Sequence, residues 1–414
     1  MTPLYNAGIA LYKTAAKIAA LRSPKIATML RGQEDTFRRL RSERERKAPD
    51  GYDLWIHAAS LGEFEQARPL IERLRREQPD VRVLLSFFSP SGFEVRKNYE
   101  YADTVVYLPF DTPSNVRSFL DAAAPRKAIF VKYEFWGNYM SELARRSIPV
   151  YLISAIFRKK QIFFRPWGGE FRGILACYSH IFVQDENSKR LLDGIGIRNV
   201  TVAGDTRFDR VCDIMAAGRE LHEIAAFCAD SQFTLIAGSS WPQDEDIYIQ
   251  WLKSRPEAKA ICAPHEFDSR RLAELLSRFG DGAMLYSDYL KNAPEPSAVR
   301  YLIIDCFGLL SSLYRYGDAA WVGGGFGAGI HNLNEAAVYG IPVIFGPRHG
   351  KFKEAADLMA CGGGFAIARA EDGRRVLDTL YGDAKARTAA GAKAGDYISR
   401  SIGATDCILT HLYK

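Results

Sequence analysis

The segment that ends at Glu335 holds the residue types with the clearest chemical meaning in this chain. Four apolar residues, Ala319–Val322, are followed by five glycines within residues 323–329. Glycine has no side chain that would keep a ligand away from backbone N–H groups. We therefore expect an anionic ligand to approach the backbone here, with contacts made by Gly323, Gly324 and Gly325.

The residues after these glycines predict a helix that opens with His331 and Asn332. The first N–H groups of a helix lack intrahelical partners and carry partial positive charge, which favours an anion. Glu335 would lie one turn into that helix, where its carboxylate can accept hydrogen bonds from two vicinal hydroxyls, as on a ribose. The pattern favours a nucleotide-sugar site, and a tight strand–loop–helix turn is the purely structural alternative.

Two better-known glycine motifs do not fit this sequence. Ile330 stands where a G-x-G-x-x-G fingerprint needs its third glycine. Residues 346–352 are one residue short of a P-loop and place Phe352 where Ser or Thr would bind magnesium. Dinucleotide oxidoreductases and P-loop hydrolases therefore lose support.

A second candidate site follows an apolar stretch near the start of the chain, where Ser60, Gly62 and Glu63 precede a helix. Ser60 and Glu63 have the spacing of a capping box, in which each side chain accepts a hydrogen bond from the other residue's backbone N–H. The functional alternative is that Glu63, near a strand's carboxyl end and a helix's positive end, stays ionised and acts as a general base.

Residues 132–137 also follow an apolar stretch and place Glu134 between aromatic residues. A carboxylate beside the faces of Phe135 and Trp136 suits the binding of a sugar ring. Ordinary core packing of the two aromatic residues is the alternative.

Two further segments fit the phosphate and the base of a nucleotide. Gly238 and Ser239 join an apolar stretch to a helix that begins near Pro242, and they can hold a phosphate through N–H and hydroxyl groups. Pro264 fixes a turn after the next apolar stretch, and His265 is expected to face the nucleotide.

Composition and charge limit the class of protein. The chain has 414 residues and a formal net charge of +6. Residues 1–47 hold eleven Lys or Arg and four Asp or Glu, so all of the excess positive charge lies in this arm. Because apolar residues recur between its lysines, we predict a helix that lies on an anionic membrane surface, with a solvated helix or a nucleic-acid-binding arm as alternatives. The seven scattered cysteines and seven separated histidines do not predict disulfides or a metal site.

Alternation of short apolar stretches with helical patterns predicts parallel sheets with helices on both faces. Helices are expected at 63–77, 91–99, 113–123, 137–146 and 185–193. We predict an N-terminal domain at 48–206 and a C-terminal domain at 207–414, with ligands bound in the cleft between them. The predicted strands are 54–58, 81–87, 104–108, 128–131, 150–154, 181–184 and 200–203, then 233–237, 258–263, 283–286, 301–304, 319–322, 342–345 and 365–368.

Taken together, these segments resemble the bacterial 3-deoxy-D-manno-octulosonic acid (Kdo) transferases of lipopolysaccharide assembly. The resemblance runs in order along nearly the whole chain. It is carried by WIHAASLGE (55–63), EFWGN (134–138), GDTRFD (204–209), AGSS (237–240), APHE (263–266), VGGGFGAGIHNLNEAA (322–337) and PVIFGPRHGKFKEA (342–355).

The resemblance implies an α/β GT-B fold, with two Rossmann-like doubly wound domains facing a cleft and a membrane-associating helical arm. It implies inverting, metal-independent and cofactor-free transfer of Kdo from CMP-Kdo to a lipid A precursor of the lipid IVA type. The enzyme would be a peripheral or monotopic protein at the cytoplasmic face of the bacterial inner membrane, with no nucleic acid as a partner.

The same resemblance assigns the site residues. The catalytic base falls on Glu63. The acceptor-binding residues are Ser60, Gly62, Glu134 and Trp136, and the donor-binding residues are Gly238, Ser239, Pro264, His265, Gly323, Gly324, Gly325, His331, Asn332 and Glu335. Another GT-B transferase with a UDP-sugar donor is the nearest alternative, followed by a non-catalytic nucleotide-sugar-binding or nucleic-acid-binding protein.

Overall fold

The computed structural model describes residues 1–218 and 220–413, and they form two compact units. Unit 1 comprises Met1–Asp209 and Ile402–Lys414, and unit 2 comprises Arg210–Ser401. The sequence predicted a single domain boundary near residue 206, with all later residues in the second domain. The structure differs at the C-terminus, where the last helix returns to unit 1.

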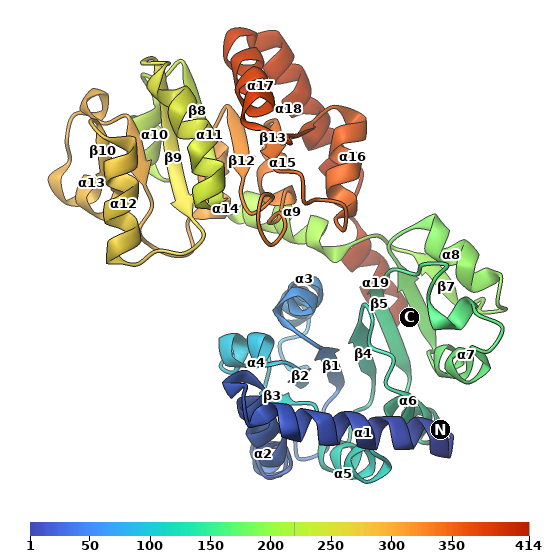
Figure 1. Cartoon of the computed structure of the whole chain (residues 1–414). Coiled ribbons are helices and arrows are strands. Elements are labelled where there is room, and N and C mark those ends of the chain that lie inside the picture. Colours follow the sequence, from blue (N-terminus) through green and yellow to red (C-terminus); the bar gives the residue numbers. More distant parts are fainter. Residues whose placement is uncertain (219, 414) are drawn as a thin grey trace. The chain divides into compact units, whose positions relative to one another are not determined.

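Unit 1 is built on a seven-stranded sheet in the order β3-β2-β1-β4-β5-β6-β7 (Figure 1). Every neighbouring pair is parallel. The strands are β1 (Leu54–Ala58), β2 (Val83–Phe87), β3 (Thr104–Tyr107), β4 (Ala128–Val131), β5 (Val150–Ala155), β6 (His180–Val183) and β7 (Val200–Val202). The helices that connect them are α3 (Leu61–Glu77), α4 (Pro90–Arg96), α5 (Pro113–Ala123), α6 (Gly137–Arg145), η1 (Ile162–Phe164), α7 (Gly169–Ala176) and α8 (Glu186–Asp193).

Both faces of this sheet are buried, which explains why its strands are apolar without alternation. Alternate residues of β1 enter different cores, with Trp55 packed on one face and Ile56 on the other. The chain winds outward in opposite directions from β1 and β4, which lie side by side. The place where the direction of winding reverses is called the switch point. In open parallel sheets, ligands bind there, beyond the carboxyl ends of the strands.

Unit 2 has a second parallel seven-stranded sheet, in the order β10-β11-β9-β8-β12-β13-β14. Its switch point lies between β8 and β12, which pair in register from Leu235 with Ala319 to Gly238 with Val322. Its strands are β8 (Phe233–Ser240), β9 (Ala258–Pro264), β10 (Ala283–Leu285), β11 (Tyr301–Ile303), β12 (Ala319–Val322), β13 (Val343–Phe345) and β14 (Gly364–Ala366). The boundary between the units lies within α9 (Thr206–Ala217). The other helices of unit 2 are α10 (His222–Cys228), α11 (Pro242–Lys253), α12 (Ser269–Phe279), α13 (Tyr286–Asn292), η2 (Pro296–Ala298), α14 (Leu310–Leu313), η3 (Tyr314–Tyr316), α15 (Asn334–Ala337), α16 (Lys353–Cys361), α17 (Ala370–Gly382) and α18 (Ala384–Ser399).

The last helix, α19 (Ala404–Leu412), belongs to unit 1 because its apolar face completes a core there. Ile408 and Leu412 are buried in the cluster that also contains Leu70 of α3. The carboxylate of Asp209 accepts hydrogen bonds from the backbone N–H groups of Gly403 and Thr405, at 2.6 and 2.7 Å. These N–H groups precede or begin the helix and would otherwise lack partners.

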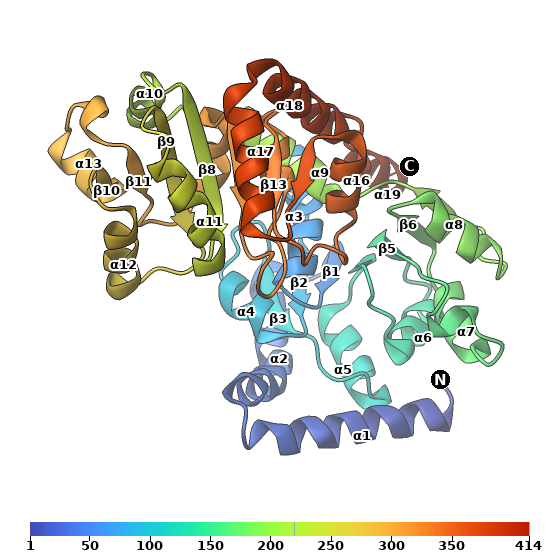
Figure 2. The ribbon, with the colours of Figure 1, turned by 45° about the horizontal axis from the view of Figure 1, so that its top comes forward.

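The N-terminal arm forms two helices, α1 (Pro3–Ala20) and α2 (Pro24–Lys47), which pack against each other at the edge of unit 1 (Figure 2). One side of α1 packs inward through Ala16, near Met29 of α2 and Phe110. The opposite side is apolar and exposed. It carries Leu4, Leu11, Ile18 and, just beyond the helix, Leu21, which are 65–85% exposed. Across the described residues, no helix combines the length and apolar character needed to cross a membrane.

Helix α6 begins without a capping side chain of its own, and distant residues satisfy its first N–H groups. The buried carboxylate of Asp111 accepts hydrogen bonds from the N–H groups of Asn138 and Tyr139, at 3.0 and 2.9 Å. The hydroxyl of Tyr5 in α1 accepts from the N–H of Gly137 and donates to Asp111, at 2.9 and 2.7 Å. Burial raises the pKa of Asp111 to about 6. The arm is therefore anchored at the helix that follows Glu134 and Trp136.

We predict that Tyr5→Phe lowers the free energy of unfolding by about 1–2 kcal/mol, because it leaves a buried N–H and a carboxylate each short of one partner. Chemical unfolding followed by circular dichroism measures the change. Tyr12→Phe is the control, since Tyr12 lies on the same helix, is 47% exposed and makes ring contacts with Phe88 and Phe110. Equal effects of the two substitutions would contradict the anchoring role of Tyr5.

Candidate functional site

The candidate acceptor residues lie at the switch point of unit 1. Ser60 is the N-cap position of α3 and is separated from β1 by Ala59, and Gly62 and Glu63 lie in the first turn of α3. The predicted capping box does not form. Instead, the hydroxyl of Ser60 donates a hydrogen bond to the Glu63 carboxylate. Glu63 is half-buried. The Glu63 carboxylate therefore bonds the side chain of the N-cap residue and not its backbone N–H.

The loop after β4 lies at the same end of the sheet, because β4 is the parallel neighbour of β1. Lys132, the first residue of this loop, has a φ of 71°, which is uncommon for a residue with a side chain. Burial raises the pKa of the next residue, Tyr133, and the negative charge of Glu63 raises it further.

Glu134 occupies a buried position and is held by donors from two directions. Its Oε2 lies 3.1 Å from Nε2 of His57 and 2.5 Å from Nε1 of Trp136. Its backbone carbonyl accepts a hydrogen bond from the hydroxyl of Tyr178. Phe135 packs on Phe163, as the core-packing alternative expects. The Trp136 ring is partly accessible and directs its N–H to the Glu134 carboxylate, and sugar binding by this segment stays a prediction.

The candidate donor residues lie at the switch point of unit 2. Gly238 and Ser239 end β8, and Gly323, Gly324 and Gly325 follow its neighbour β12. Ser239 has a φ of 51° and interrupts the pairing of β8 with β9. Pro264 ends β9, and the N–H of the next residue, His265, donates to the carbonyl of Ser240 at 3.0 Å. The predicted donor-binding residues of three separate segments therefore lie at one edge of the sheet.

The glycines of this loop are also required by its own packing. A Cβ atom on Gly323 would lie 2.3 Å from the carbonyl oxygen of Ser239, and one on Gly325 would lie 2.6 Å from the backbone of Gly346. Gly324 has a φ of 91°, a conformation that side chains disfavour. The packing alone therefore accounts for these glycines, and ligand access to their backbone stays a prediction.

Three aromatic side chains form a stack beside the glycine loop. The ring of His265 lies 4.8 Å from that of Trp241 and 4.4 Å from that of His331. Nε1 of Trp241 donates to Nε2 of His331 at 3.4 Å. Burial lowers the pKa of His331 to about 4, and His265 contributes in the same direction. His331 is therefore a neutral imidazole at neutral pH, and the bond from Trp241 assigns its proton to Nδ1.

The helix predicted at His331 begins later and is shorter than expected. His331 and Asn332 are in irregular structure, and α15 contains only Asn334–Ala337. The prediction failed because an extended segment lets the His331 ring reach Trp241. Glu335 keeps a polar environment. Its carboxylate accepts hydrogen bonds from the Ser311 hydroxyl and the Asn332 amide, at 2.8 and 3.0 Å.

Sequence reasoning missed Asp244, which holds the glycine loop. Its wholly buried carboxylate accepts hydrogen bonds from the N–H groups of Gly324 and Trp241, both at 3.1 Å, and from the ring N–H of Trp321 at 3.2 Å. The acid at the third position of a helix that starts with Pro242 was the available signal. Its neighbour Glu245 is also buried, and it pairs with Arg271 and Arg278.

A pocket with a volume of about 420 Å³ adjoins the aromatic stack. Trp241 and Phe267 give it apolar walls, while Arg270 and Arg271 add positive charge. Its full lining is Ser240, Trp241, Pro242, Glu266, Phe267, Asp268, Arg270 and Arg271. All of these residues belong to unit 2, so the candidate donor region of this unit includes both apolar and cationic surface.

The fold is similar to that of solved nucleotide-sugar enzymes at low sequence identity. A UDP-GlcNAc 2-epimerase from Neisseria meningitidis bound to UDP-GlcNAc matches with a TM-score of 0.60 and 15% identity, covering 87% of this chain and 99% of that one. A putative UDP-N-acetylglucosamine 2-epimerase from Listeria monocytogenes matches with a TM-score of 0.57 and 12% identity, covering 88% and 97%. These matches show a GT-B-like fold with two parallel sheets.

Sequence comparison identifies the relatives. Residues 32–210 match the family model described as 3-deoxy-D-manno-octulosonic-acid transferase (kdotransferase). The 3-deoxy-D-manno-octulosonic acid transferase of Bordetella pertussis is 29% identical over 380 residues, 86% of this chain and 86% of that protein. The transferase of the same name from Aquifex aeolicus is 27% identical over 76% of this chain and 82% of that protein. Over residues 32–210 by the family model, and over most of its length by these alignments, the chain is similar to 3-deoxy-D-manno-octulosonic-acid transferases.

Proposed function

We propose that this protein transfers Kdo from CMP-Kdo to a lipid A precursor in lipopolysaccharide biosynthesis. The observation that carries the proposal is the placement of the family's motifs. Those around Glu63 and Glu134 flank the switch point of unit 1, and those around Ser239 and Gly324 flank the switch point of unit 2. An acceptor region and a donor region on separate sheets are what a glycosyl transfer between two substrates requires.

The acceptor side needs one general base, and Glu63 is the residue best suited to this role. The acceptor hydroxyl is a poor nucleophile until a base removes its proton as the new bond forms. Ser60 donates to the Glu63 carboxylate, which holds the group in place, and the half-buried position leaves it open to an incoming hydroxyl. Displacement at the anomeric carbon in one step inverts its configuration. The departing CMP carries a phosphate, which needs neutralisation rather than protonation, so no metal is required in this scheme.

The donor side combines groups suited to the parts of CMP-Kdo. In this proposal the N–H groups near Gly323–Gly325 and the Ser239 hydroxyl bind the phosphate. The Nδ1–H of His331 can donate to the same anion without itself carrying charge. Glu335 would receive the ribose hydroxyls, next to the hydrogen bonds that it already accepts from Ser311 and Asn332.

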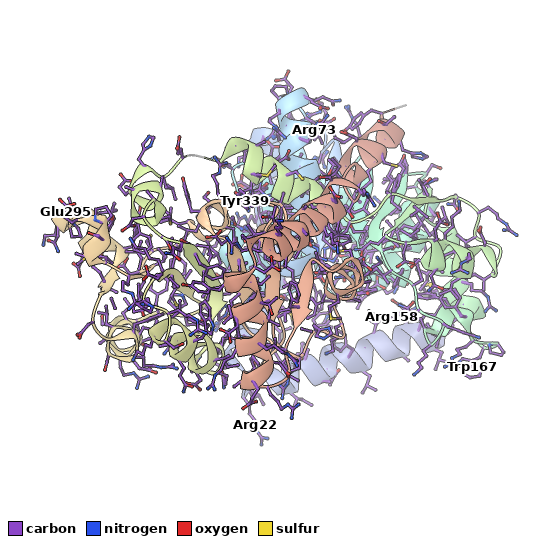
Figure 3. All side chains as sticks on the ribbon, turned by 90° about the horizontal axis from the view of Figure 1, so that it is seen from above. Arg22, Arg73, Arg158, Trp167, Glu295 and Tyr339 are labelled. Carbon is purple, nitrogen blue, oxygen red and sulfur yellow. The ribbon has the colours of Figure 1, made fainter. Side chains whose placement is uncertain are left out.

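Membrane association is proposed from the arm. The exposed apolar side of α1 is flanked by Lys17, Arg22 and Lys25, and the first acidic residue of the chain is Glu34. Arg22, just after α1, projects outward in Figure 3. An apolar side with neighbouring positive charge fits the surface of an anionic bilayer, which places the enzyme beside its lipid acceptor at the cytoplasmic face of the inner membrane.

The function is tested by incubating the protein with CMP-Kdo and a lipid IVA-type acceptor and measuring the mass of the lipid product. Addition of Kdo with release of CMP supports the proposal. Competition by CMP but not by UDP separates it from a transferase with a UDP-sugar donor. Tight binding of RNA or DNA in physiological salt without turnover would favour the nucleic-acid alternative.

We predict that Glu63→Gln lowers the rate of transfer by roughly 10²–10⁴-fold, because the amide keeps the shape of the side chain but cannot accept the proton. The variant should still fold and bind CMP. Single-turnover kinetics with saturating CMP-Kdo measures the chemical step. Glu65→Gln, the same change two residues along α3, should have near-normal rates. A near-normal rate in Glu63→Gln would move the base to Glu134.

Glu335→Ala should weaken CMP binding by about 1–3 kcal/mol, the cost of leaving buried polar groups without their partner. Isothermal titration calorimetry with CMP measures the affinity. Ser311→Ala is the matched control, because it removes one internal hydrogen bond of Glu335 and leaves the carboxylate in place. If both variants lose the same affinity, Glu335 only supports the loop and does not contact the nucleotide.

Replacing Leu4, Leu11 and Ile18 by Ser should reduce binding to phosphatidylglycerol vesicles at least ten-fold, since burial of each side chain contributes about 1.5–3 kcal/mol when complete. The substitutions keep Tyr5 and its contacts, so unit 1 should remain folded. High salt should weaken binding of the parent protein, because it screens exposed charges. Leu290→Ser with Ile402→Ser changes exposed apolar residues elsewhere and serves as the control. Unchanged binding of the triple variant in vesicle flotation would refute docking through α1.

A further inference from the structure

A buried chain of hydrogen bonds crosses the sheet of unit 1 and ends at Glu134. Nε1 of Trp55 donates to Oγ of Ser86 at 2.8 Å. Oγ of Ser86 lies 3.0 Å from Nδ1 of His57, and Nε2 of His57 lies 3.1 Å from Oε2 of Glu134. Trp55, Ser86 and His57 are completely buried. This series of hydrogen bonds therefore connects β2, β1 and the loop after β4 through side chains that are shielded from water.

The partners determine which nitrogen of His57 carries a proton. Trp55 uses an acceptor site of Ser86 Oγ, so the Ser86 hydroxyl is free to donate to Nδ1. Nε2 faces a carboxylate oxygen and must carry a proton to bond an ionised Glu134. A doubly protonated ring would also satisfy Nδ1, through the Ser86 carbonyl at 3.1 Å. In either state, Nε2–H donates to Glu134.

This donation leaves the two oxygens of Glu134 unequal. Oε2 receives N–H groups from both His57 and Trp136. Within the part of the chain that the structure describes, no hydrogen bond reaches Oε1. Glu134 is 8% exposed, at the carboxyl end of the sheet where Ser60 and Glu63 also lie. Oε1 can only accept a hydrogen bond, so its natural partner is a hydroxyl group.

We propose that His57 is a positioning residue, which holds Oε2 of Glu134 so that Oε1 is presented to a hydroxyl of the acceptor sugar. This inference rests on the proposed function and assigns part of its acceptor specificity. His57 is suited to the role because it belongs to a central strand with neighbours on both sides. A donor on a rigid strand can orient a loop carboxylate more accurately than a donor on another loop.

The test compares two amide substitutions of His57. The Gln side chain reaches about as far as Nε2 and keeps a donor for Glu134, whereas Asn reaches only as far as Nδ1 and keeps the contact with Ser86. We expect His57→Asn to raise KM for the lipid acceptor at least ten-fold and His57→Gln to raise it less than three-fold. KM for CMP-Kdo and the affinity for CMP should be unchanged in both variants.

Equal acceptor KM values in the two variants, or a parallel rise in KM for CMP-Kdo, would overturn the positioning role and leave His57 as a packing residue. If His57→Asn does not fold, Trp136→Phe supplies the comparison, because it removes only the other N–H that reaches Oε2. It should raise acceptor KM while leaving KM for CMP-Kdo unchanged, and an unchanged acceptor KM would count against the proposal.

A readout that needs no substrate separates this inference from the proposed function. In nitrogen-15 NMR of the free protein, His57 should have a protonated Nε2 whose hydrogen exchanges slowly with water, and Glu134→Ala should speed that exchange at least ten-fold. Absence of the proton from Nε2 would refute the inference even if Kdo transfer is observed. Failure of the parent protein to transfer Kdo would instead refute the proposed function, whatever the NMR result.

Discussion

Every neighbouring strand pair in both sheets is parallel, and this constraint arranges the rest of each unit. Parallel strands need a crossover after each strand, so helices cover both faces and the carboxyl ends of the strands meet at one edge. Where the direction of winding reverses, the two loops diverge and leave space for a ligand. That position lies between β1 and β4 in unit 1 and between β8 and β12 in unit 2. Four of the segments that resemble the transferases, at 55–63, 134–138, 237–240 and 322–337, lie at the carboxyl ends of these four strands.

Buried carboxylates give these loops their shape. Loop N–H groups at the edge of a sheet have no strand partners, and leaving them unbonded in the interior is costly. Asp111 receives two such groups at the start of α6, and Asp244 receives the N–H groups of Trp241 and Gly324. Glu134 is held by two ring N–H groups. Glu63 differs from these acids because its observed partner is a hydroxyl three residues away, which is compatible with a role in proton transfer.

Helix α1 uses opposite sides for two different contacts. Tyr5 directs its hydroxyl inward to Asp111 and the start of α6, while Leu4, Leu11 and Ile18 remain exposed. The inward contacts fix the arm to the helix that directly follows the loop of Glu134 and Trp136. A membrane-bound arm would therefore hold the proposed acceptor region at a set distance from the lipid surface. Trp167, in the segment between β5 and α7, is 72% exposed and lies at the periphery in Figure 3.

The sequence by itself determined the elements and their class. All fourteen predicted strands form, with ends within three residues of the prediction, because burial on both faces leaves an apolar pattern that can be recognised locally. The order of the motifs was sufficient to indicate the family. Local signals failed at Ser60, whose hydroxyl bonds the Glu63 carboxylate in place of the capping-box bonds. They also failed at His331, whose ring contacts the distant Trp241 and which precedes a shorter helix than predicted.

Only the tertiary structure decided which polar groups meet. His57 and Glu134 are 77 residues apart, Tyr5 and Asp111 are 106 apart, and Asp244 and Gly324 are 80 apart. No periodicity in the chain records such pairs, since each depends on which strands become neighbours in the sheet. The return of α19 to unit 1 has the same cause, because its apolar face fits a core made by residues more than 200 positions earlier. Secondary structure follows from local patterns of burial, whereas hydrogen-bond partners follow from the packing of segments that are distant in the sequence.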